Sequence, residues 1–235
     1  MNRYSVIRGN FPREFLLLQG RGCRWRKCTF CDYYEDASAN PYGTNKLVLE
    51  QVTGKFGVLD IINSGSAMEL DHETIETIKR LVREKGIHTL WFEAHYMYHK
   101  QLKDFASQFH PAKVKFRCGV ETFDPTLRTN WQKGIAAHVT PQDIAQHFQG
   151  LCLLCCTDTP GDTRERLLRD IELAEKHFEY YSVNVFCTNN TPIRRNDDMF
   201  RWFMAEVYTT LQKSSKAEVL IENTDLGVGD SISIF

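Results

Sequence analysis

Six short apolar runs, each followed by a stretch with helical periodicity, limit what this chain of 235 residues can fold into. The runs occupy residues 15–19, 58–63, 89–93, 114–120, 151–156 and 181–187, and their length and composition are typical of buried strands. Helices are predicted over 46–54, 71–85, 101–108, 124–131, 140–148 and 163–178, with a closing helix over 199–213 and a last short strand over 218–221.

Strands that alternate with helices favour right-handed crossovers and a parallel sheet. We therefore expect an α/β fold, a partial (β/α)6 TIM-like barrel with parallel strands, formed by a single domain over residues 1–235. No internal repeat or low-complexity linker in the sequence suggests a second domain.

A loop over residues 20–33, directly after the first predicted strand, carries three cysteines, Cys23, Cys28 and Cys31. Three close thiolates with no obvious fourth ligand indicate an iron–sulfur cluster with one iron left open. The other cysteines lie in apolar runs and are expected to be core residues; they are Cys118, Cys152, Cys155, Cys156 and Cys187.

The charge balance and the hydropathy of the sequence argue against several classes of function. Lys and Arg total 29 against 30 Asp and Glu, and this balance argues against bulk attraction to nucleic acid or anionic lipid. The N-terminus lacks the apolar region of a signal peptide, and no run of about 18 apolar residues is present to span a membrane. We expect a cytoplasmic protein that acts on a small molecule.

Polar residues gather where the predicted strands end. Ser64–Ser66, Glu93–His95, Glu121 and Asn189–Arg195 each follow a strand, as the cysteine loop does. Because parallel α/β folds bind their ligands at the carboxyl ends of the strands, these segments should share one mouth.

The spacing Cys-x4-Cys-x2-Cys after the first strand of such a barrel resembles the radical S-adenosylmethionine (SAM) superfamily. The resemblance covers most of the chain and extends to Phe30 before the last cysteine, to Ser64-Gly65-Ser66 after the second strand and to Gly119-Val120-Glu121-Thr122 after the fourth. One departure is that the superfamily usually has three residues, not four, between the first two cysteines. The resemblance implies a [4Fe-4S] cluster and SAM as cofactors, and cleavage of SAM to a 5′-deoxyadenosyl radical.

The resemblance also implies roles for residues around the mouth. Phe30 would pack near the adenine, Ser64, Gly65 and Ser66 would bind the methionine end, Glu121 would bond the ribose, and Arg128 or Lys133 would pair with the carboxylate of SAM.

Within the superfamily, the short chain and the segment Cys28-Thr-Phe-Cys-Asp-Tyr-Tyr34 are similar to the small bacterial queuine lyases of queuosine salvage. This similarity implies a lyase that takes hydrogen from the ribose of queuosine 5′-phosphate and releases queuine. The expected catalytic residues are Glu93 and His95. The expected substrate-binding residues are Arg194 and Arg195 for the phosphate, and Asp225 and Asp230, together with Glu93, for the base. A donor such as flavodoxin or ferredoxin would supply the electron, and segment 214–235 would cover the site.

Several alternatives remain open on the sequence alone. The cysteines would also suit a structural zinc site completed by a distant ligand, or a cluster that only stabilises a binding module. The radical chemistry would also suit another small molecule, a peptide or a tRNA. Ser64–Ser66 would also suit a plain turn, Glu121 a solvated loop, and Arg194-Arg195 a charged surface turn.

Overall fold

The computed structural model describes residues 1–229, which form one eight-stranded sheet with the strands in chain order. The strands are β1 (Tyr4–Ile7), β2 (Arg13–Leu18), β3 (Val58–Asn63), β4 (Thr89–Glu93), β5 (Lys113–Glu121), β6 (Gly150–Cys155), β7 (Tyr180–Val185) and β8 (Ala217–Leu220). All neighbours from β2 to β8 are parallel, and β1 is antiparallel to β2. The predicted partial barrel is confirmed, with one strand, β1, that the sequence did not indicate.

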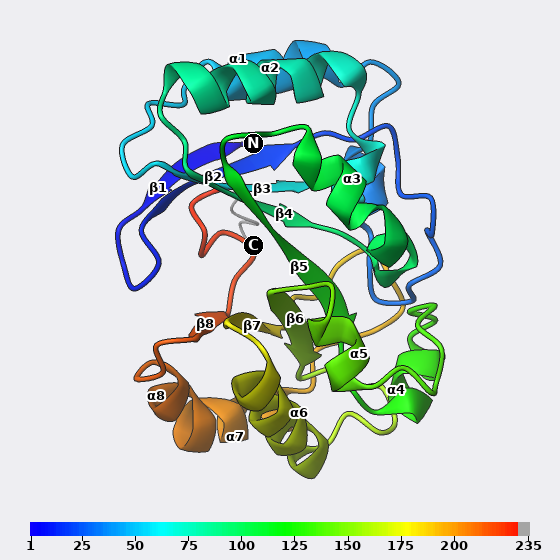
Figure 1. Ribbon diagram of the computed structural model, residues 1–235. Helices are drawn as coiled ribbons and strands as arrows, with labels where there is room; N and C mark the ends of the chain where they lie inside the picture. Colours follow the sequence, from blue (N-terminus) through cyan, green and yellow to red (C-terminus); the bar gives the residue numbers. More distant parts are fainter. Residues whose placement is uncertain (230–235) are drawn as a thin grey trace.

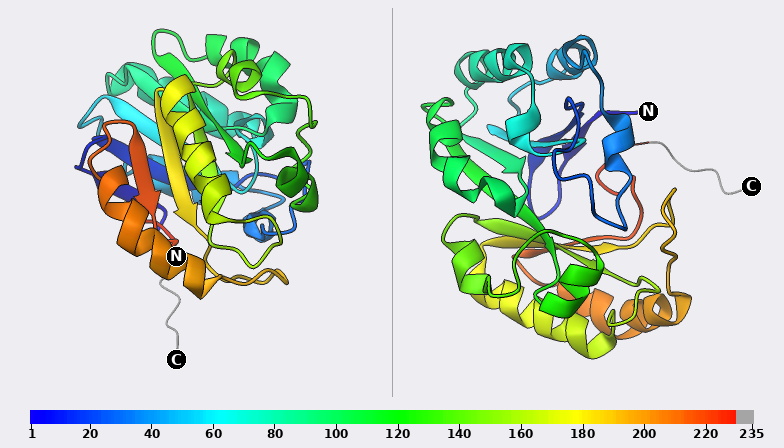
Figure 2. Two further views of the ribbon diagram at one scale, coloured as in Figure 1. Left: turned by 90° about the horizontal axis from the view of Figure 1, so that it is seen from below. Right: turned by 90° about the vertical axis from the view of Figure 1, so that its right-hand side faces the viewer.

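Helices cover the outer surface of the curved sheet (Figures 1 and 2). They are α1 (Tyr42–Leu49), α2 (His72–Glu84), α3 (Leu102–Ser107), α4 (Pro125–Asn130), α5 (Pro141–Ala145), α6 (Arg164–His177), α7 (Asp197–Trp202) and α8 (Tyr208–Leu211), the last two joined by a π turn over Phe203–Val207. Short 3₁₀ turns lie at Tyr33–Asp36, Ala67–Glu69 and Tyr96–Gln101. No helix within residues 1–229 is long and apolar enough to cross a membrane.

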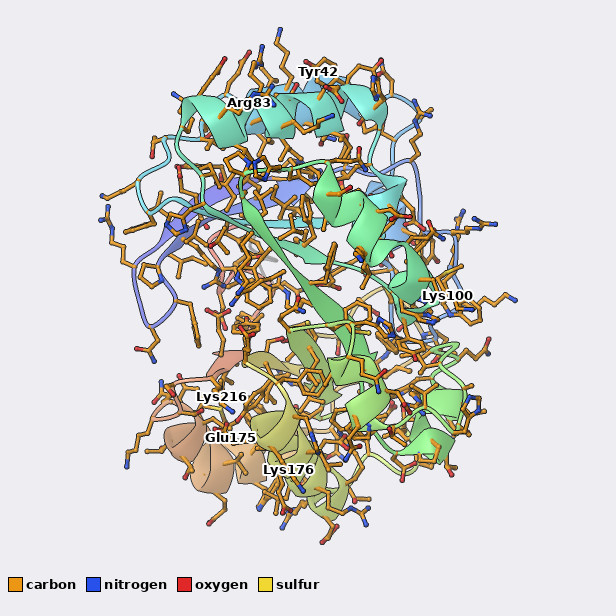
Figure 3. All side chains as sticks on the ribbon, viewed as in Figure 1. Tyr42, Arg83, Lys100, Glu175, Lys176 and Lys216 are labelled. Atoms are coloured by element: carbon orange, nitrogen blue, oxygen red, sulfur yellow. The ribbon has the colours of Figure 1, made fainter. Side chains whose placement is uncertain are left out.

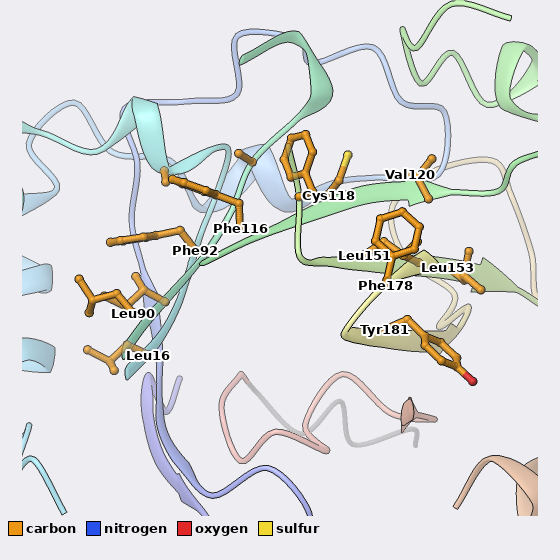
Figure 4. Close-up of a cluster of buried hydrophobic side chains, with 14 of the residues drawn as sticks. Leu16, Leu90, Phe92, Phe116, Cys118, Val120, Leu151, Leu153, Phe178 and Tyr181 are labelled. Atoms are coloured by element: carbon orange, nitrogen blue, oxygen red, sulfur yellow. The ribbon is translucent and has the colours of Figure 1, made fainter. Parts of the chain in front are cut away.

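The outer core lies between the sheet and these helices. Helix α2 begins where Asp71 accepts a hydrogen bond from the Thr74 amide at 2.8 Å, and its buried stripe includes Ile78 and Leu81. Phe92 and Phe116 pack together on the same side, with ring centroids 6.4 Å apart (Figure 4). Charged ends such as that of Arg83 lie on the outside (Figure 3). The apolar periodicity of α2 therefore corresponds to the face that it packs against the sheet.

The inner side of the sheet is polar near the start of the strands. Asp60 of β3 binds Arg13 of β2 at 2.8 Å and Arg117 of β5 at 2.6 Å, and Arg13 also binds Glu218 of β8 at 2.7 Å. Burial raises the pKa of Asp60, but the two guanidiniums outweigh it, so the net pKa is lowered. This network ties strands from both halves of the barrel together and fills its base.

The gap between β8 and β1 is bridged by the segment after β8. The amide of Gly229 donates to the carbonyl of Asn2 at 2.7 Å, and Asn2 returns a bond of 3.2 Å. In Figure 2 this segment, drawn in red, passes beside the blue N-terminal strands. The half-barrel is thus walled by a loop where a full barrel would have further strands.

Candidate active site

A cavity of about 470 Å³ lies inside the curved sheet, at the carboxyl ends of the strands. It is walled by residues from all strands after β1, by the cysteine loop and by the segment after β8. Most of the residues predicted for the cofactors and for catalysis line it; they are Cys23, Cys28, Phe30, Cys31, Ser64, Gly65, Ser66, Glu93, His95, Glu121 and Lys133. The strand-end rule thus correctly placed these segments around one space.

The three loop cysteines are free thiols at one end of this cavity. Burial raises the pKa of Cys28, and that of Cys31 to about 12, so both thiols hold their protons at neutral pH, and a metal that they bind would displace these protons. Arg26, within the four-residue spacer, has φ of 44° and donates its amide hydrogen to Cys23 Sγ at 3.3 Å. A left-handed turn at Arg26 therefore accommodates the extra residue of the spacing.

The donor set fits a cluster better than a single ion. Within residues 1–229, no group of three His, Cys, Asp or Glu side chains is arranged to hold one metal ion. Tetrahedral zinc with bonds of 2.3 Å would require thiolates about 3.8 Å apart. A cubane, in which each thiolate binds a different iron, needs wider spacing. Three thiols with no fourth side-chain ligand beside them among the described residues are the donor set of a [4Fe-4S] cluster with one iron free.

The Ser64–Ser66 segment is fixed to both neighbouring loops. Ser64 Oγ accepts from the Gly20 amide at 2.8 Å, and Ser66 Oγ accepts from the His95 amide at 3.0 Å. These bonds fix the segment in place, and the glycine between the two serines lets a ligand approach its backbone closely.

Glu69, which the sequence analysis did not single out, holds this corner together. Its carboxylate accepts from the Ser66 amide at 2.6 Å, from the Arg24 amide at 2.8 Å and from the Tyr98 hydroxyl at 2.8 Å. It connects the cysteine loop to the segment after β3. The spacing Ser66-x-x-Glu69 is a capping box, and this pattern in the sequence would have identified it.

We predict that Gly65→Ala damages this corner. A Cβ there would lie 2.0 Å from Glu69 Oε2 and 2.9 Å from the Gly22 carbonyl, so the carboxylate must move. We expect a loss of about 1–3 kcal/mol of stability and at least about a tenfold loss of SAM affinity, measured by thermal unfolding and calorimetry. Gly43→Ala is the control, because nothing lies within 4 Å of its added Cβ. Unchanged SAM binding in Gly65→Ala would contradict the predicted role of the Gly65 backbone in binding SAM.

Glu121 and Lys133 form an ion pair on the opposite wall. Lys133 Nζ lies 2.9 Å from Glu121 Oε1, and Glu121 has φ of 65° at a register shift between β5 and β6. Burial lowers the pKa of Lys133, but Glu121 outweighs it and the net pKa is raised. A Cβ at Gly119 would stand 2.9 Å from Glu121 Oε1, so a glycine keeps the space beside the pair open. Such backbone strain at a cavity wall is typical of a ligand site.

Glu93 ends β4 and presents its carboxylate to the cavity. The nearest cation is Arg117, whose Nε lies 3.9 Å from Glu93 Oε2, beyond hydrogen-bonding distance. Burial raises the pKa of Glu93, although Arg117 opposes this. The carboxylate thus lines the cavity, and no side chain or amide within residues 1–229 hydrogen-bonds to it.

His95 lies beside Glu93 but makes different contacts. Its Nε2 lies 2.6 Å from the Lys133 carbonyl, its Nδ1 accepts from the Met97 amide at 3.2 Å, and its ring stacks on Trp25 with centroids 5.4 Å apart. Burial and the charge of Lys133 lower its pKa to about 4. With both ring nitrogens bonded to backbone, His95 braces the loop after α4 against the cysteine loop, and its catalytic role stays a prediction.

This contact predicts a pH dependence of stability. The pKa of His95 is about 4 in the folded chain and 6.5 ordinarily, so the unfolded state binds the additional proton between these values. The contribution of neutral His95 to the free energy of unfolding is complete above pH 6.5 and is lost as the pH falls toward 4. We expect the wild type to lose about 1–2 kcal/mol more than His95→Gln between pH 7.5 and 5, measured by denaturant unfolding. Equal losses would contradict the prediction.

Of the remaining predicted residues, the four that the structure describes do not line the cavity. Arg128 is buried outside it, donating to the Ala136 carbonyl at 2.9 Å, which leaves Lys133 as the cation beside Glu121. Arg194 donates to the backbone of its own loop, and Arg195 pairs with Asp197 at 3.1 Å. Asp225 accepts from the amides of Ile221 and Glu222. Asp230 lies outside the described residues.

Two cavity residues that sequence reasoning did not assign are Tyr33 and Cys187. Tyr33 lines the cavity and is 57% exposed. Cys187, expected in the core, is half-buried at the rim, where its thiol lies 3.3 Å from the Ile221 carbonyl. An aromatic side chain that faces an internal space is a stacking surface for a planar ligand.

Comparison with known proteins identifies the family. No family model and no curated protein matches the chain. Among solved structures, a queuine lyase from Clostridium spiroforme bound to SAM and queuine is 39% identical, with a TM-score of 0.92 over 98% of this chain and 100% of the other. Streptococcus suis SuiB bound to S-adenosylmethionine is 13% identical, with a TM-score of 0.57 over 90% of this chain and 48% of the other, and shows the shared fold. The chain therefore belongs to the queuine lyase family of the radical SAM superfamily.

Proposed function

We propose that this protein is a radical SAM lyase that releases queuine from queuosine 5′-phosphate. The observation that carries the proposal is the match, over 98% of the chain, to a queuine lyase solved with SAM and queuine. The cavity supports it, because it combines three thiols, a glycine-bearing cradle and an unbonded carboxylate in one space.

The cofactors would be held by cavity residues of the cysteine loop and of the segments that follow β3 and β5. Cys23, Cys28 and Cys31 would bind the cluster, and the backbone at Gly65 and the Glu121–Lys133 pair would bind SAM. When bound, these groups supply a 5′-deoxyadenosyl radical. Phe30 lies 5.6 Å from Lys133 Nζ and packs edge-on against Trp131, so it is positioned to form the aromatic side of this part of the cavity.

The protein's own part is to position the substrate and exclude water. Glu93 would accept hydrogen bonds from the amidine edge of the deazaguanine, and Tyr33 would stack on a planar part of the substrate. The segment after β8 lines the open side of the cavity through Leu226 and Val228, and would shield the radical from solvent.

The cellular setting is part of the same proposal. We infer that the protein works in the cytoplasm and receives its electron from a carrier of the flavodoxin or ferredoxin type. A nucleotide is the substrate, and a net charge of -1 argues against tRNA as the direct target.

The test is anaerobic incubation of the reconstituted enzyme with SAM, a chemical reductant and queuosine 5′-phosphate. We expect queuine and 5′-deoxyadenosine to form together, and neither product with Cys28→Ala. Release of no queuine while SAM is still cleaved would overturn the substrate assignment. Assays with queuosine and with queuosine-containing tRNA would then show whether one of these is the substrate.

A further inference from the structure

The outer side of the cysteine loop is strongly basic. Arg21, Arg24, Arg26 and Lys27 are all exposed, and none of them forms an ion pair with a described acid. Together they place four positive charges within seven positions of a chain whose net charge is -1. We call this surface the basic loop face.

A second hollow, of about 510 Å³, lies on this outer side and is lined by Arg21, Arg24 and Arg26. The one acid that lines it is Glu69, whose carboxylate is already bonded to the amides of Ser66 and Arg24. The hollow is therefore positive, and it is wide open rather than enclosed, as suits a protein surface and not a small ligand.

Cys23 connects this hollow to the catalytic cavity. It lines both spaces, as Arg26 and Tyr34 also do, so the hollow and the cavity meet at these residues. The Arg26 amide hydrogen bond to Cys23 Sγ, 3.3 Å long, runs from the basic loop face to the ligand itself. Cys23 thus lies between the surface where positive charge gathers and the catalytic cavity.

We propose that the basic loop face docks a small acidic one-electron carrier protein, and that the electron enters the cluster beside Cys23. The inference rests on the proposed function, because it requires that the protein holds the iron–sulfur cluster. With a flavin carrier the balance is simple: the anionic flavin hydroquinone is oxidised to the neutral semiquinone, and the cluster is reduced by one electron from 2+ to 1+. No proton moves.

The same charge would also attract nucleic acid, but the distribution favours a protein. Recognition of tRNA needs a stripe of basic residues along an extended surface, whereas these four belong to one loop. A compact acidic patch on a small carrier is complementary to a compact basic one, and such complementarity mainly raises the association rate.

The experiment compares two charge-reversed variants of the reconstituted enzyme. One carries Arg21→Glu, Arg24→Glu and Lys27→Glu. The control carries Arg80→Glu, Arg83→Glu and Lys85→Glu, the same charge change on exposed residues at the end of α2 that leads into β4, opposite the cysteine loop. The probe is flavodoxin hydroquinone, with its oxidation followed by stopped-flow absorbance and its binding measured by calorimetry.

At low salt we expect flavodoxin to reduce the loop variant at least about tenfold more slowly than it reduces the wild type and the control. We expect its affinity for the loop variant to be at least about tenfold lower as well. The difference should vanish near 0.5 M salt, where charges are screened beyond about 4 Å. Reduction by dithionite, and queuine release with dithionite, should stay normal, which separates this inference from the proposed function. The inference fails if both variants accept electrons equally, or if the loop variant loses binding of tRNA but not of flavodoxin.

Discussion

Replacing Cys23, Cys28 or Cys31 by alanine is expected to remove the iron and to abolish SAM cleavage. The wild type should bind about four irons, because three thiolates can hold a cubane with one iron open. Two remaining thiolates leave a second iron without a protein ligand, so the cluster should be lost or broken down. Iron analysis, the visible absorption of the anaerobically reconstituted protein and 5′-deoxyadenosine formation measure the outcome.

The control is Cys187→Ala, which removes a half-buried thiol that also lines the cavity but lies at its rim. It should keep its full iron content and its capacity to cleave SAM. The assignment would be wrong if Cys187→Ala lost iron as the loop variants do, or if a loop variant retained four irons. Stoichiometric zinc in place of iron in the wild type would restore the structural-site alternative.

The parts of this site that were predictable are those that depend on local pattern and sheet topology. Apolar runs marked β2 to β8, and the rule for strand ends then placed Gly65, Glu93 and Glu121 around one cavity with the cysteine loop. β1 was missed because it has only four residues, all half-buried, and owes its place to pairing with β2.

Side-chain direction and long-range pairing could not be predicted in the same way. Arg194 and Arg195 follow β7 as predicted, but neither lines the cavity: Arg194 donates to the backbone of its own loop and Arg195 pairs with Asp197. Asp60 and Arg117 sit within strands that looked simply buried, yet they pair with each other inside the barrel. Such contacts depend on strands far apart in the sequence.

Glu93→Gln is expected to lower kcat/KM for the substrate by about 10²-fold or more while leaving SAM binding intact. The carboxylate of Glu93 can accept two hydrogen bonds from the amidine edge of the base. The amide of a glutamine can accept only one of them, because its NH2 group is itself a donor and would face the second N–H of the base. Because burial raises the pKa of Glu93, the acid limb of the wild-type pH profile should lie above the ordinary carboxyl range, and Glu93→Gln should remove it. Below that limb the protonated carboxyl no longer accepts both bonds.

Asp225→Asn is the matched control, since it makes the same change at a carboxylate that the sequence also suggested for the base. Asp225 is outside the cavity lining, where its Oδ2 accepts from the amides of Ile221 at 2.6 Å and Glu222 at 3.0 Å. We expect its activity to fall less than about threefold, because an amide oxygen can still accept these bonds. A large loss in Asp225→Asn with near-normal Glu93→Gln would move base recognition to the segment after β8. Loss of SAM binding in Glu93→Gln would instead place Glu93 in the cofactor wall, beside Glu121.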